Sequence, residues 1–452
     1  MILTSWNLYL SDAMVYKLLR FMIGAAMRLY YREISVRNRG VLDEPGPKII
    51  IANHPNTLMD AWMVGFACKQ RIYYMAKSTF FSSPLKRWFL ESLGMVPINR
   101  SSDGTMKGVS NADSFEACYK ILSEGKTLVI FPEGTSFQER HLRQLKSGAA
   151  RIALEAEKRF DKKLGVKVVP MGLIYLRAEK FRSSVMINIG EGIPVAGYVD
   201  KYTENGITTA KELTETFRIN MERLLVNSSN KEQELLVDDI VEILSSNYER
   251  SEKSSGVEEE VEQMRKVNDE LNAILLAQPW KLEEIEDLVH QIKWKIQQFD
   301  IRPDFLDRRY RPWMFIRQLV LSSLMMIIGL PIFLFGIIHN YVQYKLIDKV
   351  ILAMMKDVEY YAPVAILFSL ILYPFVYLGF TFGLNALIPL SDLEFWLYFA
   401  SMPITGMFAY YFAAYVKHVS FKLKFMLLME EDKTKLIELK RQREQLRKLI
   451  FS

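Results

Sequence analysis

Three long uncharged runs near the C-terminus constrain this chain more than any other feature of its sequence. They cover residues 318–344, 360–391 and 395–416. The second and third exceed the roughly 20 residues that an α-helix needs to cross a bilayer. The first contains Gly329-Leu330-Pro331 near its middle, a combination that kinks or breaks a helix. We therefore expect a membrane region over residues 301–425, with 360–391 and 395–416 spanning.

Positive charges around these runs indicate their orientation. Arginines precede the first run at positions 308, 309, 311 and 317, and lysines follow it at 345, 349 and 356. Further lysines follow the third run at 417, 422 and 424, whereas none separates the second from the third. Because lysine and arginine favour the cytoplasmic side, this pattern favours a hairpin of runs two and three. Run one would then enter and return at Gly329–Pro331; the alternative is three full spans with one departure from the charge rule.

The part of the chain before the membrane region alternates strand-like and helix-like segments. Short apolar runs lie at 48–52, 71–76, 127–131, 166–174 and 185–189, and helix-like stretches at 58–68, 84–92, 110–124 and 147–158. This alternation is typical of an α/β domain, here a mixed sheet flanked by helices over residues 33–205. Residues 206–300 then form a charged helical region, and 426–452 a charged helical tail.

Residues 12–31 are expected to form one helix within an N-terminal segment over 1–32. Lys17, Arg20 and Arg28 fall on one arc of this helix, and the rest of its surface is apolar. Such a helix can lie in the headgroup region of a membrane, with its basic side chains reaching toward the phosphates. The alternative is an ordinary helix packed on the α/β domain.

The composition excludes several functional classes. A net charge of +6, with no zinc-finger or RNA-binding signature, does not favour nucleic acid, but suits an anionic membrane surface or a phosphorylated substrate. The two cysteines lack metal-ligand spacing, and we expect no metal site. The N-terminus also lacks the features expected of a secretory signal. From the charge pattern around the apolar runs, we expect an integral membrane protein with its α/β domain on the cytoplasmic side.

Two short sequence motifs, or strings, contain the candidate catalytic residues, and each follows an apolar strand. NHPNTLMD covers Asn53 to Asp60, and FPEGTS covers Phe131 to Ser136. His54 lies at a strand-to-helix turn, and a histidine held by a carboxylate at one ring nitrogen can take a proton at the other. Backbone N–H groups at the start of a helix can stabilise an oxyanion. The alternative is a histidine that merely caps a tight turn.

The chain resembles the glycerol-3-phosphate / lysophosphatidate acyltransferase family. Four blocks match in order over about residues 30–200: NHPNTLMD; GMVPINR at 94–100; FPEGTS with LKSGAARIAL at 145–154; and VVPMGL at 168–173. The resemblance implies direct transfer of a fatty acyl group from acyl-CoA or acyl-ACP to a hydroxyl, with no acyl-enzyme, metal or cofactor. Its partners would be membrane lipid and the acceptor, glycerol 3-phosphate or lysophosphatidate, with no nucleic acid.

The resemblance also implies roles for individual residues. His54 would be the general base and Asp60 its orienting partner. Arg100 would bind the phosphate of the acceptor, a role that suits a guanidinium. The remaining acceptor-site residues come from the third block and the residues after it: Glu133, Gly134, Thr135, Ser136 and Lys146. Pro170 would mark a strand end near the acyl chain.

One departure from the family pattern concerns the spacing of His54 and Asp60. The family commonly has four residues between the two, and this chain has five. Since one residue rotates a helical position by about 100°, either the turn at Pro55-Asn56-Thr57 is wider or Asp60 points away. We favour the wider turn, because Pro-Asn is turn chemistry.

The wider spacing resembles a subgroup that acts on glycerol 3-phosphate, which we therefore prefer as acceptor. The alternatives are acylation of lysophosphatidate, remodelling of another lysophospholipid, and a catalytically inactive membrane scaffold that acts through residues 206–300.

Overall fold

The structure is a computed structural model that describes residues 2–98, 111–244, 256–307, 312–354, 360–431 and 433–451. The chain divides into two compact units, the first comprising the residues up to Asn230 together with Asp357–Pro363, and the second comprising Lys231–Lys356 and the residues from Val364 onward. The first unit is built on one eight-stranded sheet in the order β1-β7-β6-β2-β5-β3-β4, with β8 paired to β6. Its strands are β1 Glu33–Arg37, β2 Lys48–Ala52, β3 Ile72–Lys77, β4 Met95–Ile98, β5 Thr127–Ile130, β6 Lys167–Tyr175, β7 Ser184–Ile189 and β8 Ile193–Pro194.

The centre of the sheet is parallel, and its edge is mixed. β2 pairs in parallel with β5 and β6, so that Ile50 lies opposite Val129 on one side and Val169 on the other. The β6–β7 pair is antiparallel, and β1 pairs with β7 in parallel. Every residue of β2 is buried, as expected for a central parallel strand covered on both faces. The prediction of an α/β fold with a mixed sheet is confirmed.

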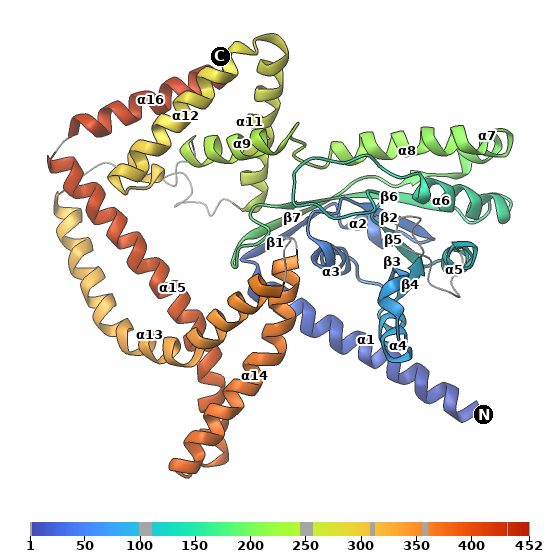
Figure 1. Cartoon of the computed structure of the whole chain (residues 1–452), viewed down its shortest axis with the longest axis horizontal. Coiled ribbons are helices and arrows are strands. Elements are labelled where there is room, and N and C mark those ends of the chain that lie inside the picture. The colour runs from blue at the N-terminus through green and yellow to red at the C-terminus, as the bar shows by residue number, and fades with distance from the viewer. Residues whose placement is uncertain are drawn as a thin grey trace. The chain divides into compact units, whose positions relative to one another are not determined.

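Helices cover both faces of this sheet, with α6 and α8 on one side and α1 and α3 on the other (Figure 1). The helices of this unit are α1 Ile2–Tyr30, α2 Gly40–Asp43, α3 Thr57–Ala67, η1 Ser78–Phe81, α4 Pro84–Ser92, α5 Asn111–Ser123, α6 Gly148–Arg159, η2 Ala196–Tyr198, α7 Val199–Glu204 and α8 Gly206–Glu222. Each helix-like stretch expected from the sequence in this unit has a counterpart among them.

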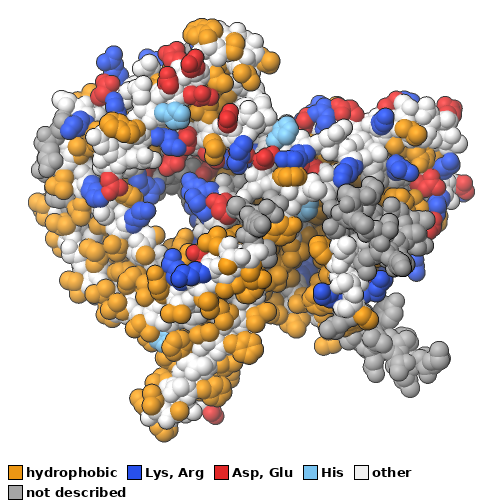
Figure 2. Space-filling view, viewed as in Figure 1, with side chains coloured by type: hydrophobic (Ala, Val, Ile, Leu, Met, Phe, Trp, Pro, Cys, Tyr) orange, Lys and Arg blue, Asp and Glu red, His pale blue; other side chains and the backbone are white. Residues whose placement is uncertain are grey.

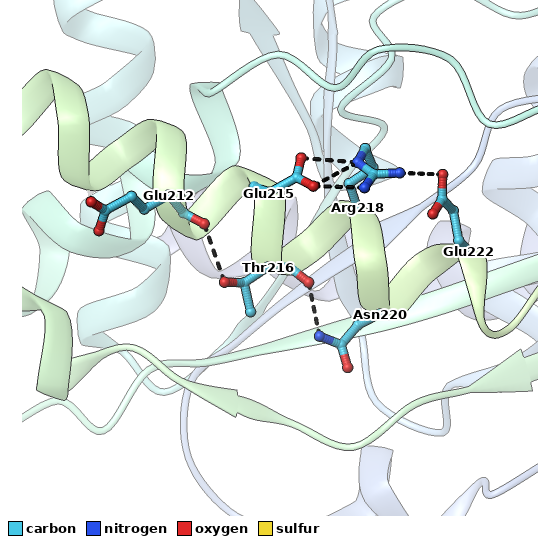
Figure 3. A network of polar contacts seen from close by, with 6 residues as sticks. All are labelled: Glu212, Glu215, Thr216, Arg218, Asn220 and Glu222. Carbon is cyan, nitrogen blue, oxygen red and sulfur yellow. Dashed lines mark hydrogen bonds and ion pairs between the residues drawn. The ribbon is translucent and has the colours of Figure 1, made fainter.

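Helix α8 belongs to the sheet unit, which therefore continues beyond the boundary expected at residue 205. Its apolar side chains, Leu213, Phe217 and Met221, are buried. The polar side of the same helix carries Arg218, which pairs with Glu215 and Glu222 one turn to either side (Figure 3). Such i, i+3 and i, i+4 pairs on an exposed face contribute only a few tenths of a kcal/mol each, about 0.2–0.5. Burial of the apolar face is what holds α8 on the domain.

Pro170 lies inside β6 rather than at a strand end, which corrects the expectation for this residue. β6 pairs with β8 up to Val168 and with β7 from Met171 onward. Pro170 falls between these two pairings, where a backbone N–H is not needed on that side of the ladder. The central strand therefore continues through a residue that would ordinarily interrupt it.

The second unit is helical. Its helices are α9 Lys231–Leu244, α11 Val257–Ala277, α12 Trp280–Phe299, η3 Pro303–Asp307, α13 Pro312–Met354, α14 Tyr361–Leu387, α15 Asp392–Glu431 and α16 Lys433–Phe451. α16 packs against α12, burying Leu436, Leu439 and Leu446. The side chain of Gln442 in α16 also accepts a hydrogen bond of 2.8 Å from Lys295. The charged tail is thus part of a helical bundle with α9, α11 and α12.

Two of the described helices are long and apolar enough to cross a membrane, Leu319–Met354 within α13 and Tyr361–Leu387. α13 continues through Gly329 and Pro331, so the described residues have no re-entrant turn there. Whether 318–344 crosses a membrane stays a prediction. α15 likewise runs unbroken through 395–416, and its crossing of a membrane stays a prediction.

α13 and α15 are antiparallel and closely packed. Along the pair, Ser322 bonds with Tyr415, and Asn340 bonds with the carbonyl of Met402. Gly336 lies at the closest approach, where an added Cβ would be 2.2 Å from the carbonyl oxygen of Thr405. A residue without a side chain at such a crossing lets the two helices approach closely.

Candidate active site

The strand-to-helix turn after β2 positions the candidate base. His54 follows the buried strand by two residues, and α3 begins at Thr57. Asn56 adopts φ −142° and ψ 44°, and Thr57 has φ +43°, a left-handed conformation that a β-branched residue rarely takes. This widened turn absorbs the additional residue between His54 and Asp60.

His54 and Asp60 form a hydrogen-bonded pair. The ring nitrogen Nδ1 of His54 lies 2.9 Å from Oδ2 of Asp60. The Asp60 side chain is fully buried, whereas that of His54 is 17% exposed. An ionised carboxylate only accepts hydrogen bonds, so Nδ1 is the donor in this pair and Nε2 is the ring nitrogen left to take a proton. Nε2 has no hydrogen-bond partner within the described part of the chain, so this nitrogen can serve as a base.

Asp60 is held by two further donors. The backbone N–H of Asn56 donates to Oδ2 at 2.7 Å, and the hydroxyl of Tyr175 donates to Oδ1 at 2.7 Å. Burial, followed by the charge of Asp60, raises the pKa of Tyr175 well above its usual value. The phenol therefore keeps its proton and remains a donor. Three donors satisfy the buried carboxylate and fix its orientation toward His54.

Glu133, which lies in the FPEGTS motif, forms a hydrogen bond with the NHPNTLMD motif. Its Oε1 accepts a hydrogen bond of 2.9 Å from the backbone N–H of His54. Burial raises the pKa of this carboxyl, against the opposing effects of backbone hydrogen bonds from His54 and Arg143. The N–H groups of His54 and Asn56 are thus both bound to carboxylates, and neither is free for an oxyanion as the position of the turn suggested. The expected role of Glu133 in the acceptor site stays a prediction.

The loop after β5 brings the third block beside the histidine. The backbone N–H of Phe137 donates to the carbonyl of His54 at 3.1 Å. Gly134 has φ +80°, and a Cβ there would lie 2.5 Å from Nζ of Lys146, which places this ammonium directly over the glycine. Thr135 is exposed and Ser136 is partly buried in the same loop. The structure therefore gathers Glu133, Gly134 and Lys146 around the turn that carries His54.

Three residues of the site were not found from the sequence. Phe131 stacks on the His54 ring with centroids 4.2 Å apart, and Asn53 exchanges two hydrogen bonds with the backbone of Leu173. Tyr175 is the third. Phe131 and Asn53 belong to the two strings, so their position was a usable signal. Tyr175 had no such signal, because a tyrosine ending an apolar strand is common. Arg100 lies outside the described residues.

The match to known proteins covers the part of the chain that carries this site. Residues 33–174 match the Acyltransferase family model. The chain carries an acyltransferase domain. Both strings, His54, Asp60 and the β5–α6 loop lie inside the matched residues, while Tyr175 lies immediately after them.

Curated relatives of the acyltransferase domain are similar over short stretches. A glycerol-3-phosphate O-acyltransferase 2 of Saccharomyces cerevisiae is 35% identical over 106 residues, which are 23% of this chain and 14% of that protein. A chloroplastic 1-acyl-sn-glycerol-3-phosphate acyltransferase of Arabidopsis thaliana is 27% identical over 128 residues, 28% of this chain and 32% of that protein. The chain thus spans about a third or less of these relatives.

One solved structure is also similar to part of this chain. It is the 1-acyl-sn-glycerophosphate acyltransferase of Thermotoga maritima, with a TM-score of 0.31 and 19% identity over 45% of this chain and 79% of that one.

Proposed function

We propose that this protein is a membrane-bound O-acyltransferase that transfers a fatty acyl group from a thioester donor to glycerol 3-phosphate. The observation that carries the proposal is the His54–Asp60 pair, at 2.9 Å, inside the residues that match the acyltransferase family. A buried carboxylate that fixes one ring nitrogen of a partly exposed histidine is the arrangement a general base requires.

The reaction proceeds in one displacement. Nε2 of His54 takes the proton from the acceptor hydroxyl as its oxygen attacks the thioester carbonyl. The C–S bond then breaks, and the thiolate of CoA or acyl carrier protein receives the proton from His54. Asp60 stabilises the transient imidazolium and does not take up the proton. No acyl-enzyme, metal or cofactor takes part, and a chelator is expected to leave the rate unchanged.

Two acceptors have specific support. The two yeast relatives, at 35% and 32% identity, are named glycerol-3-phosphate acyltransferases, which favours glycerol 3-phosphate. The Arabidopsis relative is named for acylation of 1-acyl-sn-glycerol 3-phosphate, which favours lysophosphatidate as the second candidate. Both acceptors carry a phosphate, and we assign its recognition to Arg100 and Lys146.

The membrane location rests on the apolar helices. Hydrophobic side chains crowd the surface over α13, α14 and α15, while charged side chains gather over α12 and α16 (Figure 2). Ile327 of α13 is 72% exposed, and Phe375 of α14 is 70% exposed. Side chains of this kind are stable when lipid covers them. The acyltransferase domain would face the cytoplasm, where the charge rule places the start of α13.

The deciding experiment offers purified full-length protein, in detergent, a labelled long-chain acyl-CoA. Glycerol 3-phosphate and lysophosphatidate are supplied in parallel, with the His54→Ala protein as control. We expect transfer to glycerol 3-phosphate by the native protein and none by His54→Ala. Transfer only to lysophosphatidate would assign the second acceptor. A fully active His54→Ala protein would end the proposed mechanism.

A second arm tests the phosphate contact. Arg100→Ala is expected to raise the KM for glycerol 3-phosphate at least tenfold, because a guanidinium–phosphate contact of roughly 1.5–3 kcal/mol is lost. The KM for acyl-CoA should stay unchanged. An unchanged KM for the acceptor would remove Arg100 from the phosphate site.

A further inference from the structure

A groove of about 740 Å³ lies between α13 and α15 and is outside the candidate active site. This volume lies within the range of ligand sites, about 300–1,000 Å³. Its walls are largely apolar and are formed by Met326, Ile327, Leu330 and Phe333 of α13 with Phe412 and Val416 of α15. Apolar walls of this kind suit an acyl chain better than they suit water.

One end of the groove is charged. Lys417, Ser420 and Lys424 of α15 line it there, together with Asp300, the residue that directly follows α12. Asp300 forms an ion pair with Lys424. Lys417 is exposed, lies over the Phe421 ring at 5.6 Å, and has no carboxylate partner among the described residues. Two ammonium groups against one carboxylate leave the groove entrance positive.

The groove has the length of one membrane leaflet. At 1.5 Å per residue, α15 covers about 18 Å between Phe412 and Lys424. Half of the hydrocarbon core of a bilayer is about 15 Å thick. A lipid whose phosphate lies beside the lysines would therefore place the end of one acyl chain near Phe333 and Phe412. A single lipid molecule in one orientation can therefore place its phosphate beside the lysines and its acyl chain along the apolar walls.

We propose that this groove binds an anionic glycerophospholipid, with one acyl chain between α13 and α15 and the phosphate beside Lys417 and Lys424. The proposal rests on the proposed function only in requiring that these helices lie in a membrane. Basic side chains between membrane helices recognise anionic headgroups in this way. Asp300 competes with the phosphate for Lys424, so the empty and occupied sites differ in the partner of this lysine.

The test measures lipid retention by the full-length protein in detergent, using native mass spectrometry. Dioleoyl phosphatidate and dioleoyl phosphatidylcholine are titrated separately, because they differ in headgroup charge and share their acyl chains. We expect phosphatidate to bind at least about fivefold more tightly, the effect of one lysine near an anionic lipid. Equal binding of the two lipids by the native protein would overturn the proposal.

Charge variants locate the headgroup. Lys417→Gln with Lys424→Gln is expected to abolish the preference for phosphatidate. The matched control is Lys345→Gln with Lys349→Gln, which removes two exposed lysines from the opposite end of α13. It should leave the preference intact. A preference lost equally in both proteins, or retained in both, would show that the groove lysines do not select the lipid.

Two further variants should change lipid binding, one by removing a competing charge and one by filling the groove. Asp300→Asn removes the competing carboxylate while retaining a residue that tolerates the left-handed conformation at this position, φ 49°. It should tighten phosphatidate binding about fivefold. Ala413→Trp fills the apolar part of the groove and should weaken binding of both lipids. Unchanged lipid binding in Ala413→Trp would exclude the acyl chain from the groove.

Failure of this proposal can be told apart from failure of the proposed function. The His54→Ala protein should lose acyl transfer and retain the phosphatidate preference. A native protein that transfers no acyl group but prefers phosphatidate through Lys417 and Lys424 would refute the proposed acyltransferase activity. It would still support the proposed lipid site. Acyl transfer together with equal binding of phosphatidate and phosphatidylcholine would support the proposed activity and refute the lipid site.

Discussion

Tyr175 donates a 2.7 Å hydrogen bond to Asp60, on the carboxylate oxygen that His54 does not use. The tyrosine is the last residue of β6, and the aspartate lies in the first turn of α3. The bond therefore ties the orientation of the carboxylate to the central sheet. Tyr175 acts on His54 only through Asp60, which makes it a positioning residue.

Replacing Tyr175 by phenylalanine should lower kcat about tenfold. The change removes one hydrogen bond to a buried charged group, a contact of roughly 1.5–3 kcal/mol, and leaves the ring in place. His54 would then be held by a less constrained carboxylate. Steady-state kinetics with saturating acyl-CoA would measure the loss, and the KM for both substrates should change little.

Tyr74→Phe provides the matched control for this variant. The Tyr74 hydroxyl donates at 2.6 Å to the backbone carbonyl of Ala61, in the same helix α3, but does not touch Asp60. Its loss should lower the Tm and leave kcat within about twofold, since a neutral hydrogen bond contributes roughly 1 kcal/mol. Equal losses of kcat in the two variants would assign Tyr175 a purely structural role.

Asp60→Asn should lower kcat by about two to four orders of magnitude, the range expected when a base loses its orienting carboxylate. Asp60 accepts from His54, Asn56 and Tyr175, and an amide places an NH2 group where one of these donors points. The Tm should fall as well. Asp43→Asn makes the same change at a surface ion pair with Lys69 and should leave kcat unaffected. A kcat near the native value in Asp60→Asn would separate Asp60 from the chemistry.

The elements around this site were predictable because their signals are local. The apolar run at 48–52 has the same bounds as β2, and the helix-like stretch at 84–92 has the same bounds as α4. Continuous apolar runs bounded by turn residues suffice to place buried parallel strands. Asp60 was also found locally, since the wide turn leaves it only six positions from His54.

Contacts between distant positions could not be predicted in this way. Tyr175 and Asp60 are hydrogen-bonded although they are 115 residues apart in the sequence, and no periodicity in the sequence indicates this contact. The same holds for α16, which the sequence indicates only as a charged helical tail, because its leucines are buried through packing against α12. Pro170 was misjudged for a related reason, because the change of partner from β8 to β7 that accommodates it belongs to the sheet and not to β6 alone.

The stability of the acyltransferase domain should respond to pH through Glu133. Burial raises the pKa of this carboxyl above its usual 4.5. Between the usual and the raised value, the unfolded chain releases its proton before the folded chain does, so the folded state loses stability as pH rises through this interval. Glu133→Gln removes this loss and retains an acceptor for the His54 N–H. Its Tm relative to the native protein should therefore rise as pH increases from 4.5 through the raised pKa of the folded state.

Glu124→Gln gives the control of opposite sign. The hydrogen bond from Lys126 lowers the pKa of the exposed Glu124 carboxyl. Its contribution to stability is present above 4.5 and lost as pH falls through the lowered folded pKa. The Tm of Glu124→Gln relative to the native protein should thus fall, slightly, as pH rises. A Tm difference for Glu133→Gln that is constant with pH would contradict the assigned burial effect.

The last prediction concerns Arg20, which the sequence grouped with Lys17 on one basic face of α1. In the structure the Arg20 guanidinium donates to the carbonyls of Lys69 at 3.0 Å and Gln70 at 3.2 Å, just beyond the end of α3. A cation there satisfies backbone acceptors and opposes the negative end of the helix dipole. This supports the reading of α1 as a helix packed on the domain at this residue.

Arg20→Gln should therefore destabilise the acyltransferase domain by roughly 1–3 kcal/mol, whereas Lys17→Gln, at an exposed position one turn earlier, should be neutral. Both variants remove one positive charge from the same helix. Urea unfolding would measure the stability difference, and sedimentation with anionic vesicles would measure membrane binding. If Arg20 held α1 to lipid instead, the two variants would weaken vesicle binding equally and leave the unfolding midpoints at the native value.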